Sequence, residues 1–297
     1  MAPTRRNGLE TLTSNDSRRS VALPYLALLG ALLALPTGTS FAKQLFPVVG
    51  AEGTSLYRVG FSALFLWLVW KPWKRVWSRK ELADVAAYGA ILGAMNLSFY
   101  MSLRTLPLGI AIAVEFLGPL SLALIHSRKL VHFLWVLLAS AGLFLLLPLR
   151  DSETSLHPVG LAFAGAAGLF WALYIVYGQR ASYLPAGQTV ALGMTAATCV
   201  IAPFGLAVGG AALLTPKFLG LGVIAALLSS TLPYSLEMIA LRRIPKRVFG
   251  VLLAAEPALG AVVGTLLLNE LLSSTQWLAI GLIVVAGVGS ILTGQEG

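Results

Sequence analysis

Residues 107–126 read PLGIAIAVEFLGPLSLALIH, and the only charged residue among them is Glu115. An α-helix needs about twenty mostly apolar residues to cross the hydrocarbon core of a bilayer. A charged side chain in the middle of such a helix is unfavourable, so it usually faces a partner or a wet cavity. The stretch therefore predicts a membrane-spanning helix with a carboxyl group near its centre.

The rest of the chain shares this apolar character. Of its 297 residues, 57% are hydrophobic and 11% are charged, and the mean hydropathy is +0.83. A soluble domain carries roughly 25% charged residues. The apolar excess extends over the whole length, so it is too large for a soluble domain with a single anchor helix. We expect an all-α integral membrane protein surrounded by a lipid bilayer.

Ten apolar runs are long enough to span a bilayer. They lie near residues 24–43, 54–71, 83–103, 107–126, 131–149, 158–178, 187–208, 218–241, 248–268 and 275–293. The connections between them are short and leave little room for a soluble domain. We therefore expect ten transmembrane helices. Residues 1–22, which contain four arginines, are expected to form a disordered cytoplasmic tail.

The basic residues predict the orientation of these helices. Cytoplasmic connections of membrane proteins carry an excess of Lys and Arg. With the N-terminus in the cytoplasm, 16 of the 21 Lys and Arg residues fall on the cytoplasmic side and 4 on the other. Both termini are therefore expected in the cytoplasm. The net charge of +9 then reflects orientation, and no nucleic-acid partner is expected.

An internal repeat relates the two halves of the chain. Residues 95–119 align without a gap with residues 233–257, at an offset of 138 residues, and Pro119 falls on Pro257. The third and fourth spans thus match the eighth and ninth. This predicts two five-helix repeats, residues 23–150 and 151–297. Five is odd, so the second repeat is inverted. Transporters with inverted repeats bind substrate between the repeats, near the membrane midplane.

Four ionisable residues lie inside the predicted spans: Arg58, Glu115, Glu237 and Glu256. In the repeat alignment Glu256 falls on Gly118, about one helical turn from Glu115. Both carboxyl groups are therefore expected to face similar parts of their repeats. Together they can bind a cation such as a substrate ammonium, or share a proton. The alternatives are structural ion pairs or protonated carboxyls, and for Arg58 a side chain that reaches the outer surface.

Polar and aromatic residues complete the candidate site. The third span carries Asn96 and Tyr100, the sixth Trp171 and the eighth Tyr234, each on a plausible inner face. Packing against a neighbouring helix is the alternative for each of them. The predicted substrate-binding or proton-coupling set is Glu115, Glu256, Glu237, Arg58, Asn96, Tyr100, Tyr234 and Trp171.

The sequence contains no enzyme signature. It lacks the zinc-protease pattern H-E-x-x-H, the hydrolase pattern G-x-S-x-G and the phosphate-binding pattern G-x-x-x-x-G-K. Its single cysteine, Cys199, excludes an intrachain disulfide and a cysteine-based metal site. We expect no catalysis, no cofactor and no metal. Without a nucleotide site, transport has to be driven by a gradient.

Several stretches are similar to the bacterial threonine/homoserine exporters of the EamA family, in the drug/metabolite transporter superfamily. The most specific ones read LPLGIAIAVEFLGPL at 106–120 and STLPYSLEMIALRRIPKRVFGVLLAAEPALGAVVG at 230–264. The resemblance covers nearly the whole chain after residue 22. It implies ten helices in two inverted repeats, the bacterial inner membrane, and export of small amino acids by proton antiport. It assigns no site residues.

These observations predict an alternating-access exporter whose partners are a small amino acid, protons and the bilayer. The substrate ammonium would approach Glu115 or Glu256. Arg58, if it faces inward, would pair with the substrate carboxylate or with a glutamate. Related family members move other metabolites, so an exporter of another metabolite or a drug stays open. A non-transporting assembly or sensor subunit also stays open, and it predicts a closed, fully packed centre. The sequence leaves the oligomeric state undetermined.

Overall fold

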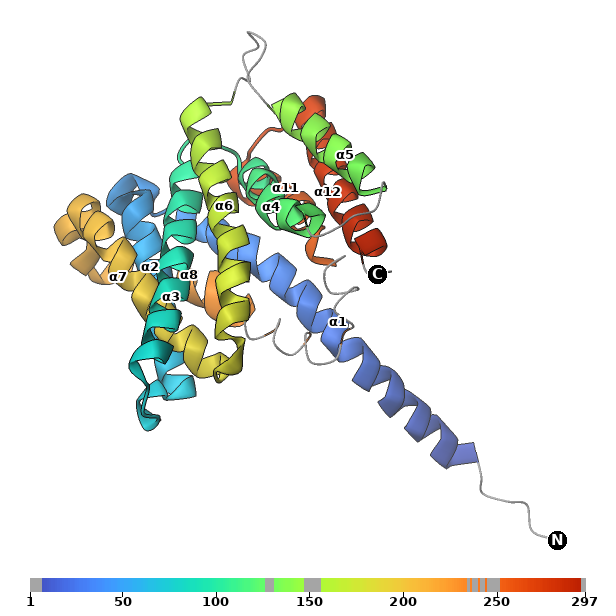
Figure 1. Ribbon diagram of the computed structural model, residues 1–297, viewed down its shortest axis with the longest axis horizontal. Coiled ribbons are helices and arrows are strands. Elements are labelled where there is room, and N and C mark those ends of the chain that lie inside the picture. Colours follow the sequence, from blue (N-terminus) through green and yellow to red (C-terminus); the bar gives the residue numbers. More distant parts are fainter. Residues whose placement is uncertain are drawn as a thin grey trace.

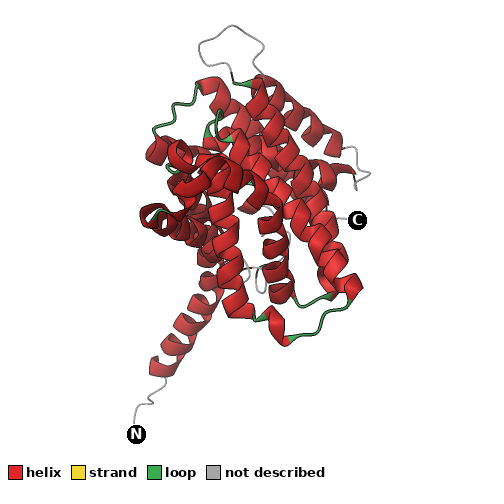
Figure 2. Cartoon of the chain, turned by 90° about the vertical axis from the view of Figure 1, so that its left-hand side faces the viewer, coloured by secondary structure: helices red, strands yellow, loops and turns green. Residues whose placement is uncertain are grey.

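A computed structural model describes residues 7–125, 131–146, 156–233, 236, 240, 244 and 252–294. Within this part of the chain every regular element is a helix (Figure 2), so the all-α prediction is confirmed there. The main helices are α1 (Asn7–Lys43), α2 (Phe46–Trp70), α3 (Arg79–Ser102), α4 (Leu108–Ile125), α5 (Val131–Leu146), α6 (Pro158–Arg180), α7 (Ala186–Gly209), α8 (Pro216–Ala226), α11 (Glu256–Leu268) and α12 (Ser274–Gly294).

The helices have the length and surface of membrane spans. Four described stretches are long and apolar enough to cross a bilayer: Leu23–Lys43, Arg79–Ser102, Pro158–Tyr183 and Ala186–Leu214. Shorter apolar helices lie beside them. Many large apolar side chains point outward, and Val69, Leu169 and Leu266 are each at least 60% exposed. A surface of this kind fits lipid better than water, so the protein is a membrane protein.

Helix α1 begins earlier than the sequence predicts. It starts at Asn7, so residues 7–22 are helical where a disordered tail is expected. No proline or glycine interrupts residues 9–23. Adding a turn to an existing helix is easier than nucleating a new one, which explains the extension. This end of α1 projects away from the other helices (Figure 1).

Helices α4 and α11 lie against each other in the interior of the bundle (Figure 1). α4 also packs on α6 and α12, and α11 also packs on α1. α2 runs along α7, α3 contacts both α6 and α7, and α5 pairs with α12. The largest cluster of buried apolar side chains centres on α4, from Leu108 to Leu120. The polar residues of α4 and α11 are therefore held inside an apolar bundle.

Several helices are broken or bent at depth. α2 contains a kink at Gly50, whose φ of 72° is in the left-handed region that favours glycine. α8 continues into a π-helical turn, η4 (Leu227–Thr231). Another break precedes α11, because residues 254–255 form a turn. π-helical turns often occur at functional sites, and discontinuous helices form the binding sites of many transporters.

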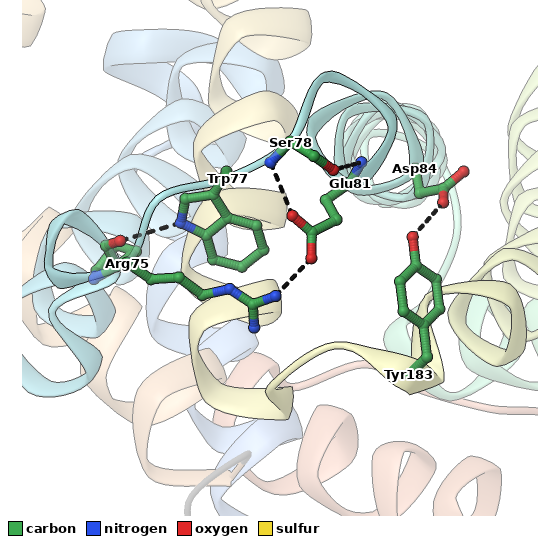
Figure 3. Close-up of polar contacts among 7 residues, drawn as sticks. Arg75, Trp77, Ser78, Glu81, Asp84 and Tyr183 are labelled. Atoms are coloured by element: carbon green, nitrogen blue, oxygen red, sulfur yellow. Dashed lines mark hydrogen bonds and ion pairs between the residues drawn. The ribbon is translucent and has the colours of Figure 1, made fainter.

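A polar network fixes the start of α3 (Figure 3). The Ser78 hydroxyl accepts from the Glu81 N–H, and the Glu81 carboxylate accepts from the Ser78 N–H. This capping box satisfies two N–H groups at the helix terminus. Arg75 pairs with the same carboxylate, and the Tyr183 hydroxyl donates to Asp84. The last contact joins α3 to the short helix η2 (Ala181–Tyr183) that follows α6.

At the opposite end of the bundle, the Glu270 carboxylate joins three helix ends. It lies in the connection between α11 and α12. Its Oε1 accepts from Lys43 Nζ, at the end of α1, at 2.6 Å. Its Oε2 accepts from the N–H of Leu108, the first residue of α4, at 2.7 Å. A negative charge at a helix N-terminus is favourable, so Glu270 caps α4.

The crossing of α4 and α6 depends on glycine. A Cβ atom at Gly118 would lie 1.8 Å from the carbonyl oxygen of Gly168. A Cβ at Gly168 would lie 2.7 Å from the carbonyl oxygen of Glu115. The two backbones therefore touch directly, beside the residue that carries the buried carboxyl group. Close approach through small residues is a common way for helices to associate in membranes.

We predict that Gly118→Ala destabilises the protein, because its methyl group would force α4 and α6 apart. Overpacking of this kind costs about 1–3 kcal/mol. Thermal unfolding of the detergent-solubilised protein measures the effect. Gly165→Ala on α6 is the matched control, because a Cβ there meets no atom within 4 Å. Equal stability of the two variants would show that the crossing tolerates separation.

Candidate functional site

Arg58 lies inside the bundle, with 5% of its surface exposed. Its Nε donates to the Ser230 hydroxyl at 2.9 Å, and its Nη2 donates to the Ser229 carbonyl oxygen at 2.9 Å. Both acceptors belong to η4. A buried charge is tolerated only where such partners replace water. Arg58 therefore faces the interior, and the alternative of a side chain that reaches the outer surface is wrong.

Tyr100 of α3 lies beside Arg58. The Arg58 guanidinium carbon is 5.5 Å from the centre of the Tyr100 ring, a distance at which a cation and an aromatic ring attract. Phe46 and Phe99 also pack near the ring, each with its centroid 6.0 Å away. Tyr100 is completely buried. Its hydroxyl oxygen has no hydrogen-bond partner in the described part of the chain.

Glu115 and Glu256 both face the interior, and each keeps 8% of its surface exposed. Glu115 lies within α4, seven residues after its start. Glu256 is the first residue of α11, directly after the break at residues 254–255. Because α4 and α11 pack together, the two carboxyl groups come from adjacent helices.

The two carboxyl groups and Arg58 form one electrostatic cluster. Glu115 is close enough to interact with the charges of both Glu256 and Arg58, and Glu256 is close enough to interact with Arg58. Among the described residues, however, neither carboxyl group has an ion-pair partner within 4 Å or a hydrogen bond. The acidic pair is thus near a fixed positive charge without being neutralised by direct contact.

Asn96 and Trp171 are the other two predicted site residues that the structure describes. Asn96 is buried, and its amide donates to the Leu92 carbonyl oxygen of its own helix at 2.9 Å. That bond occupies one of its donors and leaves its oxygen available. Trp171 is half-buried on α6 and stacks edge-on with Phe116, the neighbour of Glu115, at 6.2 Å. The other two predicted site residues, Tyr234 and Glu237, lie outside the described residues.

The sequence prediction missed Ser229 and Ser230 as partners of Arg58. Both are buried, and the Ser229 hydroxyl donates to the Ala225 carbonyl oxygen at 2.6 Å. The only signal in the sequence is three consecutive hydroxyl residues, 229–231, within an otherwise apolar run. Such a run is also common where helices merely pack, so it does not reveal which charge the hydroxyls serve.

A groove of about 580 Å³ between α4 and α6 is a poor candidate for the site. Its lining is apolar apart from Ser121, and none of the predicted site residues lines it. A charged substrate would lose its hydration there without gaining partners. No group of three His, Cys, Asp or Glu side chains in the described ranges is arranged to hold a metal ion.

The arrangement as a whole pairs one fixed cation with two carboxyl groups inside an apolar bundle. Arg58 uses two of its five N–H groups for the contacts to η4. The other three N–H groups have no acceptor among the described residues. An arginine fork of this kind suits a carboxylate, and a carboxylate pair suits an ammonium group or a proton. The cluster therefore has the chemistry to recognise a small zwitterion.

Comparison with known proteins identifies close relatives. A protein of Escherichia coli (strain K12), the threonine/homoserine exporter RhtA, is 45% identical over 273 residues, covering 92% of each chain. The protein of the same name from Salmonella typhimurium (strain LT2) is 46% identical over the same shares. These relatives bear the names of exporters and not of enzymes, as the sequence predicts for this chain.

The fold also has a solved counterpart. A crystal structure of a protein 20% identical in sequence superposes with a TM-score of 0.58, over 92% of this chain and 98% of the other. At this identity the likeness concerns the fold alone. The sequence pattern of the EamA-like transporter family matches residues 158–292, from the start of α6 into α12. Together with relatives at 45% identity across most of the length, this match shows that the chain belongs to the EamA-like transporter family.

Proposed function

We propose that the protein exports threonine, homoserine or similar small amino acids across the bacterial inner membrane. The observation that carries the proposal is the 45% identity over 92% of the chain to proteins named for that activity. The cluster of Arg58, Glu115 and Glu256 supports it independently. A free amino acid carries one carboxylate and one ammonium group, and the cluster has a partner for each.

We further propose that the chain forms ten spans in two inverted repeats, residues 23–150 and 151–297. The helix contacts support this. If the repeats are exchanged, the α3–α6 contact corresponds to the contact of α1 with α8 and η4. The α4–α6 contact corresponds in the same way to the α1–α11 contact. The structure contains each of these contacts. The α2–α7 and α5–α12 pairs map onto themselves. The family match also begins where α6 begins.

The distribution of Lys and Arg supports an orientation with both termini in the cytoplasm. On this proposal, the start of α3 with Arg75 and Arg79 faces the cytoplasm. The Glu270 cap then lies at the external end of the bundle, together with the Arg104–Glu52 ion pair. The second pair is longer, at 3.4 Å, and Arg104 is largely exposed, so it contributes little.

The mechanism we propose is alternating access with proton antiport. Substrate enters from the cytoplasm, its carboxylate binds Arg58, and its ammonium binds Glu115 or Glu256. Asn96, Tyr100, Tyr234 or Trp171 contacts the rest of the substrate, and Glu237 belongs to the same predicted set. A proton from outside then neutralises a carboxylate and removes the partner of the ammonium group. Coupling of this kind needs only that proton and substrate compete for one carboxylate.

Two rival functions remain distinguishable. An exporter of another metabolite or a drug would use the same fold, and a panel of labelled substrates separates it from an amino-acid exporter. A non-transporting assembly or sensor subunit predicts that the interior glutamates are closed off in ion pairs. The absence of such pairs for Glu115 and Glu256 among the described residues favours a transporter.

We predict that Glu115→Gln and Glu256→Gln each lower export of labelled threonine from loaded cells by roughly tenfold to a hundredfold. The estimate is the loss of one hydrogen bond to a charged group, about 1.5–3 kcal/mol. Asp84→Asn, near the start of α3 and only partly buried, is the matched control. If both glutamine variants are expressed and export normally, the two carboxyl groups have a structural role and do not take part in transport.

We also predict that export depends on the proton gradient. Vesicles loaded with labelled threonine or homoserine should lose the label several-fold more slowly after an uncoupler collapses the gradient, because the proton no longer displaces substrate. Vesicles without the protein give the background leak. If the rate of label loss from vesicles with the protein is unchanged by the uncoupler, the protein is still an exporter but does not work by proton antiport.

A further inference from the structure

The Tyr100 hydroxyl is an unexplained feature of the site. It is completely buried and has no hydrogen-bond partner in the described part of the chain. Leaving a buried hydroxyl unpaired is unfavourable, because it loses its hydrogen bonds to water and gains none in return. A phenylalanine would fill the same space without that cost. The unpaired hydroxyl is therefore unfavourable in this state, and none of the described residues supplies a partner for it.

The surroundings of Tyr100 point to the bound substrate as that partner. The centre of the ring lies 5.5 Å from the Arg58 guanidinium carbon, so the Arg58 and Tyr100 side chains are neighbours. Arg58 is itself held in place by Ser229 and Ser230 of η4. Phe46 and Phe99 hold the ring from other directions. The Arg58 fork and the Tyr100 ring are thus both held in place beside each other, and one small molecule that contacts Arg58 can also reach the side chain of Tyr100.

Tyr57 gives an internal comparison. It is also a buried tyrosine, on the same helix as Arg58, but its hydroxyl donates to the Leu213 carbonyl oxygen at 2.7 Å. That tyrosine has a complete structural role within the protein. Tyr100 lacks such a bond although it is buried more completely. The difference separates a tyrosine that stabilises the fold from one whose hydroxyl is available to a ligand.

We propose that the Tyr100 hydroxyl recognises the side-chain hydroxyl of the substrate and so selects hydroxy amino acids over apolar ones of the same size. This inference rests on the proposed function and adds a specificity determinant to it. With the substrate carboxylate on Arg58, the side-chain hydroxyl pairs with Tyr100. The hydroxyl becomes accessible as the helices around it separate during transport. A substrate without a hydroxyl leaves the tyrosine unpaired, which is the physical basis of the selection.

The test compares threonine with valine, which replaces the hydroxyl by a methyl group at nearly the same size. The unmodified protein should export threonine at least about tenfold more efficiently than valine. Tyr100→Phe keeps the ring beside Arg58 and removes only the hydroxyl. We expect this variant to export threonine about tenfold less efficiently, to export valine as before, and so to lose the preference. Efflux of both labelled amino acids from the same loaded cells gives the ratio.

Tyr57→Phe is the matched control, because it also removes one buried tyrosine hydroxyl. It should lower thermal stability, since it breaks the bond to Leu213, and leave the threonine-to-valine ratio unchanged. Tyr100→Phe should keep or raise the thermal stability of the substrate-free protein. A clear loss of stability would mean that the Tyr100 hydroxyl already has a structural partner, and would overturn the inference.

The outcomes also separate this inference from the exporter proposal. If the unmodified protein exports threonine and Tyr100→Phe retains the preference over valine, Tyr100 is not the determinant and the proposed function stands. If the unmodified protein exports both amino acids equally, the selection itself is absent and only the inference fails. If it exports neither, the proposed function fails as well. For poorly expressed variants, stabilisation of purified protein by threonine and by valine gives the same ratio.

Discussion

The buried guanidinium of Arg58 is the constraint on which the rest of the site depends. A permanent positive charge in the interior of an apolar bundle is stable only with fixed acceptors around it. Two acceptors come from η4, and the π-helical turn places a free backbone carbonyl and a hydroxyl within reach of one side chain. The irregular helix is therefore not a defect. It supplies the solvation that water cannot supply at this depth.

Much of this could be predicted from the sequence. The apolar runs predicted helices in the described ranges. The rarity of charge within them singled out Glu115 and Glu256 as inward-facing residues and Arg58 as a candidate whose orientation the sequence left open. That inference works because the energetic cost of a buried charge is large and local. The partners of Arg58 could not be predicted, because they depend on where α2 crosses η4. The extension of α1 into residues 7–22 was also missed. The composition of these residues favours a solvated tail, and they become helical because the neighbouring span already forms a helix that they can extend.

The site combines rigid and irregular parts. Glu115 belongs to an α4 whose backbone touches that of α6 at Gly118 and Gly168, so its position follows the α4–α6 crossing. Glu256 instead begins a helix directly after a turn, where the backbone has fewer intrahelical hydrogen bonds. Two carboxyl groups with similar burial are thus supported differently. The fold can hold one of them still while the segment before the other rearranges, without separating the helices that carry them.

The Glu270 carboxylate gives these two helices a common pivot. It fixes the first residue of α4, and it belongs to the connection that follows α11, where its own N–H donates to the Gly264 carbonyl oxygen. A Cβ at Gly264 would lie 2.4 Å from this carboxylate, so α11 is shaped to receive it. Glu115 and Glu256 each lie about two helical turns, or roughly 11 Å, from the pivot. A change of about 10° in the angle between the two helices then displaces the carboxyls by only about 2 Å, while the far end of α4 at Ile125 moves further. The Glu270 contact therefore limits how far the two carboxyl groups separate when the angle between α4 and α11 changes.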